Sequence, residues 1–78
     1  MVDMEQIAFE LEGHKFVELN QLLKLVGLCD SGGAGKMIVA SGAVYVDGQQ
    51  ELRKTCKIHQ GQIVRLDEVE IHVVAGGG

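Results

Sequence analysis

Aromatic side chains are scarce in this chain, which has one tyrosine, two phenylalanines and no tryptophan among 78 residues. The core must therefore be aliphatic, built from valine, isoleucine and leucine. A chain of this length forms one domain and lies near the lower limit for folding without disulfides or metal. We expect that domain to span residues 1–75, and residues 76–78 to form a flexible glycine tail.

Membrane-spanning and secretion signals are also lacking. No apolar run approaches the roughly 20 residues that cross a bilayer. The N-terminus, Met1 to Gln6, lacks the basic-then-apolar pattern of a secretion signal. The simplest expectation is a cytoplasmic protein.

Cysteine and histidine are few and scattered. Cys29 and Cys56 form no C-x-x-C pair, and the three histidines do not lie at metal-ligand spacing. We expect ordinary thiols, no metal and no cofactor. Spacing suggests no Ser-His-Asp or Cys-His arrangement, so we do not expect an enzyme.

Charge is segregated along the chain, although the formal net charge is only −4. Residues 1–23 carry five acids and one lysine, and residues 66–78 carry three acids. Residues 24–65 carry six cations and three acids, for a local net charge of +3. A local cationic surface of this kind suggests an anionic partner. Chance clustering on a solvated surface remains the alternative.

Hydrophobic periodicity predicts a strand and then two helices. Residues 6–12 alternate as a strand, with a turn after them. A short helix then ends at Gly27 and carries an apolar stripe, which leaves Lys24 facing solvent. Asp30 or Ser31 caps a second helix, which ends at Gly42. The two buried stripes are Leu19, Leu22, Leu23 and Val26 in the first helix, and Ala34, Met37 and Ile38 in the second.

The second half of the chain is predicted to form antiparallel strands. Residues 44–46 form a strand, and Asp47-Gly48 is a strong two-residue hairpin signal. A polar, cationic connection runs over residues 51–57, and residues 62–66 and 69–74 form two final strands. Helices grouped at one end of an antiparallel sheet indicate an α+β domain.

The glycine-rich segment Ser31-Gly-Gly-Ala-Gly-Lys36 does not fit a nucleotide-binding motif. A Walker loop needs glycine at Asp30 and a hydroxyl residue at Met37, and the dinucleotide fingerprint needs glycine at Ile38. What remains is a helix N-terminus whose exposed amides attract a phosphate, with Lys36 one turn further on. A tight turn between two packed helices explains the glycines equally well.

A second cationic feature lies at Arg53-Lys54-Thr-Cys-Lys57, with three cations in five residues. These charges repel one another unless an anion is near. They follow a hairpin that can bring them beside the helix entrance. We therefore favour a binding patch over a solvated loop.

Several segments, in this order, resemble the RNA-binding domain typified by small-subunit ribosomal protein S-four. This domain is also called the alpha-L motif, and the likeness extends to its stand-alone bacterial form, the YbcJ-type small RNA-binding proteins. The resemblance runs from about Phe16 to the end and implies two short helices packed against a small, bent antiparallel sheet. It rests on Phe16-Val-Glu-Leu-Asn-Gln-Leu-Leu-Lys24, Ser31-Gly-Gly-x-x-Lys36, Ile38-x-x-x-Gly42-x-Val44-x-Val46-Asp-Gly48, Arg53-Lys54-x-x-Lys57 and Gly61-Gln-x-Val64.

Four positions depart from the family pattern. Asp47 replaces asparagine and Gln62 replaces aspartate, both at turns, where we expect little effect. Gly35 replaces alanine inside the second helix, at an expected cost of about 0.5–1 kcal/mol. Cys56 stands where the family is often basic, which predicts weaker affinity.

The resemblance implies a module that binds structured RNA as a monomer, with ribosomal RNA or a ribosome-assembly particle as its target. Lysine and arginine would neutralise phosphates. With so few aromatic residues, base stacking is not the expected main mode. The implied contact residues are Lys24, Ser31, Gly32, Gly33, Lys36, Arg53, Lys54 and Lys57.

Two other functions remain open. The ending Val74-Ala-Gly-Gly-Gly78 resembles the tail of ubiquitin-like sulfur carriers, whose terminal Gly-Gly is activated and thiolated. The order of elements, with two adjacent helices before the hairpin, fits poorly with the β-grasp fold of those carriers. A protein-binding adaptor with incidental basic residues is the other alternative.

Overall fold

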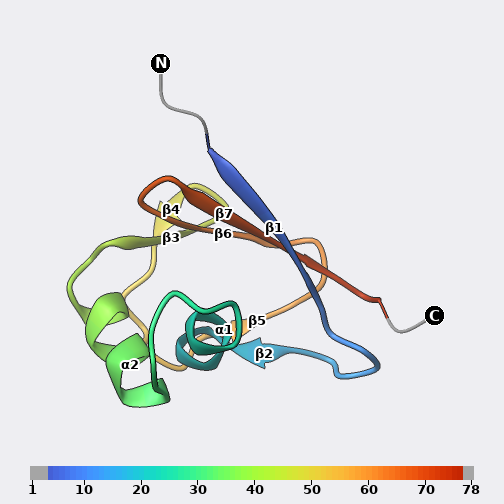
Figure 1. Ribbon diagram of the computed structural model, residues 1–78, viewed down its shortest axis with the longest axis horizontal. Coiled ribbons are helices and arrows are strands. Elements are labelled where there is room, and N and C mark those ends of the chain that lie inside the picture. Colours follow the sequence, from blue (N-terminus) through green and yellow to red (C-terminus); the bar gives the residue numbers. More distant parts are fainter. Residues whose placement is uncertain (1–3, 77–78) are drawn as a thin grey trace.

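A computed structural model describes residues 4–76 of the chain. Two helices stand between strands in the sequence (Figure 1). The elements, in chain order, are β1 (Glu5–Glu10), β2 (Val17–Glu18), α1 (Leu19–Leu25), α2 (Gly32–Ala40), β3 (Val44–Val46), β4 (Gln49–Gln50), β5 (Lys57–Ile58), β6 (Ile63–Leu66) and β7 (Val69–Val74). The predicted α+β class with two short helices is confirmed.

The main sheet has five strands in the order β1-β7-β6-β3-β4, and β2 pairs with β5 in a separate two-stranded sheet. The sheet is mixed, because β1 runs parallel to β7 while the other pairs are antiparallel. The expectation of a wholly antiparallel sheet was therefore wrong at this edge. The first and last strands meet only after the whole chain has folded back, and no local pattern encodes that pairing.

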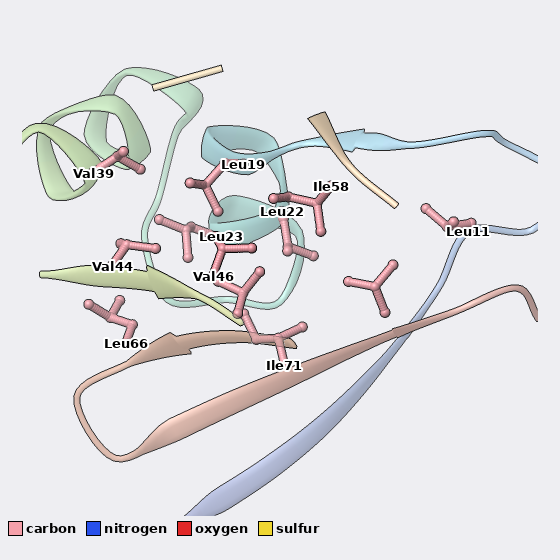
Figure 2. Packing of buried hydrophobic residues seen from close by; sticks show 12 residues of the cluster. Leu11, Leu19, Leu22, Leu23, Val39, Val44, Val46, Ile58, Leu66 and Ile71 are labelled. Carbon is pink, nitrogen blue, oxygen red and sulfur yellow. The ribbon is translucent and has the colours of Figure 1, made fainter. Parts of the chain in front are cut away.

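An aliphatic core fills the space between the helices and one face of the sheet, as the scarcity of aromatic residues predicted. Alternate residues of β3, β6 and β7 point inward, towards three buried leucines of α1 (Figure 2). Both helices lie on this same side of the sheet (Figure 1). The buried apolar residues are Leu11, Leu19, Leu22, Leu23, Val39, Val44, Val46, Ile58, Val64, Leu66, Ile71 and Val73.

Helix α1 follows its predicted stripe and stop. Leu19, Leu22 and Leu23 are fully buried, and Lys24 is exposed. Gly27 has a φ of 85°, and its amide bonds to the Lys24 carbonyl at 3.0 Å. A left-handed residue just after a helix end is favourable for glycine, so the stop occurs where it was predicted.

Helix α2 begins and ends as predicted but buries a different face. Its buried residues are Gly35 and Val39, whereas Met37 is 76% exposed. The predicted stripe was therefore wrong at Met37, whereas Ile38 packs against the core and Ala34 is half-buried. The reason is close packing: a Cβ built on Gly35 would lie 2.5 Å from the Asn20 carbonyl oxygen of α1. The helix turns its glycine, not its larger side chains, towards its neighbour.

The hairpin at Asp47-Gly48 is confirmed, with φ values of 51° and 84° that suit a tight two-residue turn. The predicted polar connection over residues 51–57 leads into β5 (Lys57–Ile58), which sequence patterning missed because a two-residue strand has no period to detect. Neither α1 nor α2 is long and apolar enough to cross a membrane, within residues 4–76. Of the predicted glycine tail, Gly77 and Gly78 lie outside the described residues.

Candidate nucleic-acid interface

The start of α2 presents backbone amides on an open surface. Ser31 caps the helix, since its Oγ accepts a hydrogen bond from the Ala34 amide at 3.1 Å. Within residues 4–76, neither Gly32 nor Gly33 donates its amide to another protein group. A Cβ on Gly33 would meet nothing closer than Ser31 Oγ at 3.9 Å, whereas one on Gly32 would lie 2.7 Å from Gln21 Nε2, so an anion has room to approach at Gly33. Free amides at a helix start carry partial positive charge and favour such an anion.

The loop at residues 53–57 is held against the other helix by backbone hydrogen bonds. The Leu19 amide donates to the Cys56 carbonyl at 2.8 Å, and the Asn20 amide donates to the Lys54 carbonyl at 3.2 Å. Pairing of β2 with β5 places Lys57 opposite Glu18. The loop therefore supplies partners for the otherwise unpaired amides at the start of α1. The backbone that carries Lys54 and Lys57 is fixed beside that helix, and both side chains are exposed.

Asn20 joins these two halves of the site. It is 3% exposed, its main-chain amide binds the loop at Lys54, and its Nδ2 donates to the Gly32 carbonyl at 3.3 Å. The Asn20 main-chain carbonyl oxygen lies so close to Gly35 that only a residue without a Cβ fits there. Asn20 Oδ1 is buried without a hydrogen-bond partner among residues 4–76. Asn20 thus ties the helix entrance to the cationic loop, the entrance through its side chain and the loop through its main-chain amide.

Sequence reasoning missed the role of Asn20, although a signal was present. Asn20 follows Leu19 and stands one turn from Leu23, so it belongs to the buried side of α1. A buried amide side chain needs hydrogen-bond partners, and those partners mark a structural junction.

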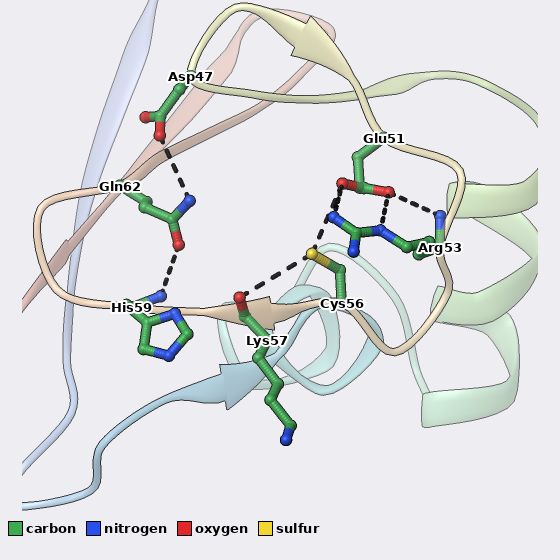
Figure 3. A network of polar contacts seen from close by, with 7 residues as sticks. All are labelled: Asp47, Glu51, Arg53, Cys56, Lys57, His59 and Gln62. Atoms are coloured by element: carbon green, nitrogen blue, oxygen red, sulfur yellow. Dashed lines mark hydrogen bonds and ion pairs between the residues drawn. The ribbon is translucent and has the colours of Figure 1, made fainter.

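Arg53 is not a free cation, because it pairs with Glu51. Its Nη2 lies 2.9 Å from Glu51 Oε1, and its Nε and main-chain amide donate to Oε2 at 3.0 and 2.9 Å (Figure 3). These hydrogen bonds lower the pKa of Glu51 to about 2 and raise the pKa of Arg53. The anion that the cationic cluster needs is thus partly supplied by the chain itself. Arg53 remains 78% exposed, so one side of its guanidinium still faces solvent.

Cys56 lies in the same network. Its Sγ is 3.6 Å from Glu51 Oε1, and burial together with that carboxylate raises the pKa of the thiol. A raised pKa keeps the thiol neutral and poorly nucleophilic. Cys29 and Cys56 are both free thiols, as expected. No group of three metal-binding side chains occurs in the described part of the chain.

The four remaining predicted cations stand on different segments, and all four side chains are exposed: Lys24, Lys36, Lys54 in the loop after β4, and Lys57. Lys57 Nζ lies 5.0 Å from the centroid of the Phe16 ring, within cation–π range, and its side chain points away from the Glu51–Arg53 pair (Figure 3). Lys36 is exposed on α2 and Lys24 is exposed on the last turn of α1. Lys24 makes no ion pair or hydrogen bond with another predicted site residue among residues 4–76.

Two departures from the family pattern contact each other. Asp47 accepts hydrogen bonds from the Ile63 amide at 2.9 Å and from Gln62 Nε2 at 3.3 Å. Gln62 Oε1 in turn accepts from the His59 amide at 2.7 Å (Figure 3). The pair of side chains therefore connects the hairpin tip to the loop before β6.

Comparison with known proteins identifies one family. The S4 domain family matches residues 9–74. The "Putative RNA-binding protein YbcJ" of Escherichia coli (strain K12) is 48% identical over 67 residues, which cover 86% of this chain and 96% of that protein. The "Uncharacterized protein YbcJ" of Shigella flexneri is equally similar, at 48% identity over the same lengths.

A solved structure agrees with these relatives. The solution structure of YbcJ from E. coli, whose title reports an alpha-L motif involved in RNA binding, matches with a TM-score of 0.65 and 43% sequence identity. The match covers 96% of this chain and 92% of that one. The family match, the close relatives and the shared fold agree, and the chain belongs to the S4 domain family.

Proposed function

We propose that this chain is an RNA-binding module that recognises structured RNA through its cationic surface. That surface consists of the α2 entrance (Ser31–Gly33), Lys36 and the loop at residues 53–57. The names of the YbcJ relatives support RNA as the ligand. The observation that carries the proposal is the junction at Asn20, which fixes the entrance and the loop in one arrangement.

The residues of this surface divide the work of binding. Lys36, Lys54 and Lys57 neutralise phosphates and release counterions. The Gly32 and Gly33 amides donate to a phosphate and fix its register. The segments that carry these groups are held in place by hydrogen bonds. Groups in fixed positions recognise the shape of the RNA sugar-phosphate backbone more than the base sequence. Arg53 contributes less than the lysines, since Glu51 already balances its charge.

The finer expectations belong to the same proposal. The target is structured RNA, with ribosomal RNA or a ribosome-assembly particle as the family-derived choice. The module works as a cytoplasmic monomer and carries out no catalysis. Lys24 is a peripheral contact, because it stands on the far turn of α1.

Charge reversal tests the proposed surface. Lys36→Glu combined with Lys54→Glu removes two phosphate contacts, each worth about tenfold in affinity. We expect affinity for an RNA hairpin to fall about 100-fold at low salt, and the slope of log K against log salt to fall by about 2. Fluorescence anisotropy with a labelled hairpin measures both quantities.

A matched control separates local contacts from net charge. Lys15→Glu changes the net charge as much as Lys36→Glu does, but Lys15 lies outside the proposed surface. It should reduce affinity only slightly. Unchanged RNA binding in the double variant, or equal losses from Lys15→Glu and from Lys36→Glu alone, contradicts this assignment.

A further inference from the structure

A groove is lined by the end of β1, the segment that leads into β2, and one side of α1. Its lining runs along residues 9–12 and 16–18, with His14, Gln21 and Leu25 completing the wall. Its volume is about 470 Å³. That volume falls within the roughly 300–1,000 Å³ of typical binding pockets. The groove is therefore large enough to receive side chains of another molecule.

Two large apolar side chains of the groove face water. Phe16 is 37% exposed and Leu25 is 59% exposed, although the chain is short of aromatic residues. Phe9, Leu11 and Val17 continue the apolar lining beneath them. A contiguous apolar surface with a polar rim is typical of an interaction site, whereas apolar side chains exposed singly are common on any protein surface. Apolar side chains of a partner would fit here.

The rim of the groove is acidic. Glu10, Glu12 and Glu18 line it, and no lysine or arginine does. Within residues 4–76 the ion pairs are Arg53–Glu51 and His72–Glu70, so the three groove carboxylates have no ion-pair partner. Three unpaired carboxylates repel RNA phosphates and attract cations.

We propose that this groove docks a basic segment of a partner protein, in which an apolar side chain is flanked by lysine or arginine. The apolar side chain packs between Phe16 and Leu25, and the flanking cations pair with the glutamates. This occupant satisfies both properties of the groove, whereas RNA satisfies neither. The proposal does not depend on RNA binding at the other surface.

A second copy of the chain is the nearest competitor. The exposed segment Leu52-Arg53-Lys54 has similar chemistry. However, Arg53 is paired with Glu51, and the Lys54 carbonyl is bonded to α1. Its arginine is thus already balanced by a carboxylate of the same chain, and its backbone is bonded to α1, so it matches the groove less well than a free basic segment does. A separate partner protein is therefore the occupant we propose.

The groove adjoins the proposed RNA-binding surface. Phe16 lines the groove and also contacts Lys57 of the cationic loop. Glu18 also lines the groove and stands opposite the same lysine in the register of the β2–β5 pair. A basic protein segment in the groove therefore sits next to Lys57 of the cationic surface.

A peptide titration tests the docking proposal. The probe is a short peptide of alternating leucine and lysine, and its controls replace lysine by glutamate or leucine by serine. Amide shifts in NMR spectra should concentrate at Leu11, Phe16 and Leu25 with the probe and be absent with both controls. Neutralising Glu10→Gln with Glu12→Gln should weaken the probe about tenfold. Leu25→Ser, at an exposed position, should weaken it similarly.

Matched variants decide the result. Asp67→Asn with Glu68→Gln removes the same charge at the β6–β7 turn, away from the groove, and should leave probe affinity unchanged. RNA affinity should not fall in the Glu10/Glu12 variant, because that change removes only negative charge. Equal weakening by both charge variants would mean non-specific attraction and overturn the proposal. So would groove shifts that grow with protein concentration alone, which indicate a second copy, or groove shifts with an RNA hairpin.

Discussion

Two surfaces flank α1, and they differ in charge and in construction. The cationic surface is built from backbone: loop carbonyls cap α1, and Asn20 links that loop to α2. The groove is built from side chains, with apolar residues below and glutamates around them. Both surfaces depend on the same seven-residue helix.

This difference indicates two kinds of recognition. Fixed backbone donors suit a ligand of fixed shape, such as folded RNA. Apolar and carboxylate side chains adapt to a peptide, whose affinity comes from burial of an anchor and from charge steering. A small acidic protein can therefore hold an anionic ligand on one side and a cationic partner on the other.

The largest expected effect comes from Gly35→Ala, which should damage the cationic surface. The new Cβ would lie 2.5 Å from the Asn20 carbonyl oxygen, so α1 and α2 must move apart. Overpacking costs about 1–3 kcal/mol, against a gain of at most about 1 kcal/mol in helix propensity. We expect a lower free energy of unfolding and weaker RNA binding, measured by urea denaturation and anisotropy.

Gly33→Ala is the matched control for that change. Its Cβ meets nothing closer than 3.9 Å, so the same substitution in the same helix should leave stability equal or slightly higher. Helix propensity alone predicts that both variants are stabilised. A more stable Gly35→Ala protein would contradict the close packing described above.

A smaller effect should appear in the pH dependence of stability. The pKa of Glu51 is lowered from 4.5 to about 2 in the folded state, so the unfolded chain binds more protons between these values. The stabilisation is complete above about pH 4.5 and is lost as the pH falls towards 2. Melting temperatures of the wild type and Glu51→Gln should differ by a constant amount above pH 4.5 and converge near pH 2. A difference that stays constant down to pH 2 would show that the Arg53 pair does not stabilise the fold.

The smallest expected effect concerns Arg53 and RNA. Glu51→Gln with Arg53→Gln removes a paired charge of each sign and leaves the net charge unchanged. We expect RNA affinity to change less than about twofold, whereas Lys54→Gln should cost about tenfold. Anisotropy titrations compare the two. An equal loss would place Arg53 among the direct contacts and remove the distinction between paired and unpaired cations.

Features set by neighbouring residues could be predicted from the sequence. The stripe of α1, the stops at Gly27 and Gly42, the Ser31 cap and the Asp47-Gly48 turn each depend on a few adjacent positions. The parallel β1–β7 pair depends on the whole chain, and no local pattern specifies it. Met37 was misplaced because the packing of α2 is set by a glycine, which hydrophobic periodicity does not count.

The candidate site was predictable in its parts but not in its assembly. The helix entrance and the cationic loop were both recognised from residue types. Their junction at Asn20 was not, because it requires contacts between residues 12 and 34 positions apart. The Glu51–Arg53 pair had a local signal: residues two apart in an extended segment share a face.

Amide mapping with an RNA hairpin tests the central claim most directly. The claim is that the two flanks of α1 bind different partners and that RNA occupies the cationic flank. Titration of the hairpin should shift the amides of Gly32, Gly33, Lys36, Lys54 and Lys57 and leave those of Glu10, Glu12 and Leu25 unchanged. Shifts centred on the groove, or spread evenly over both flanks, would contradict the claim.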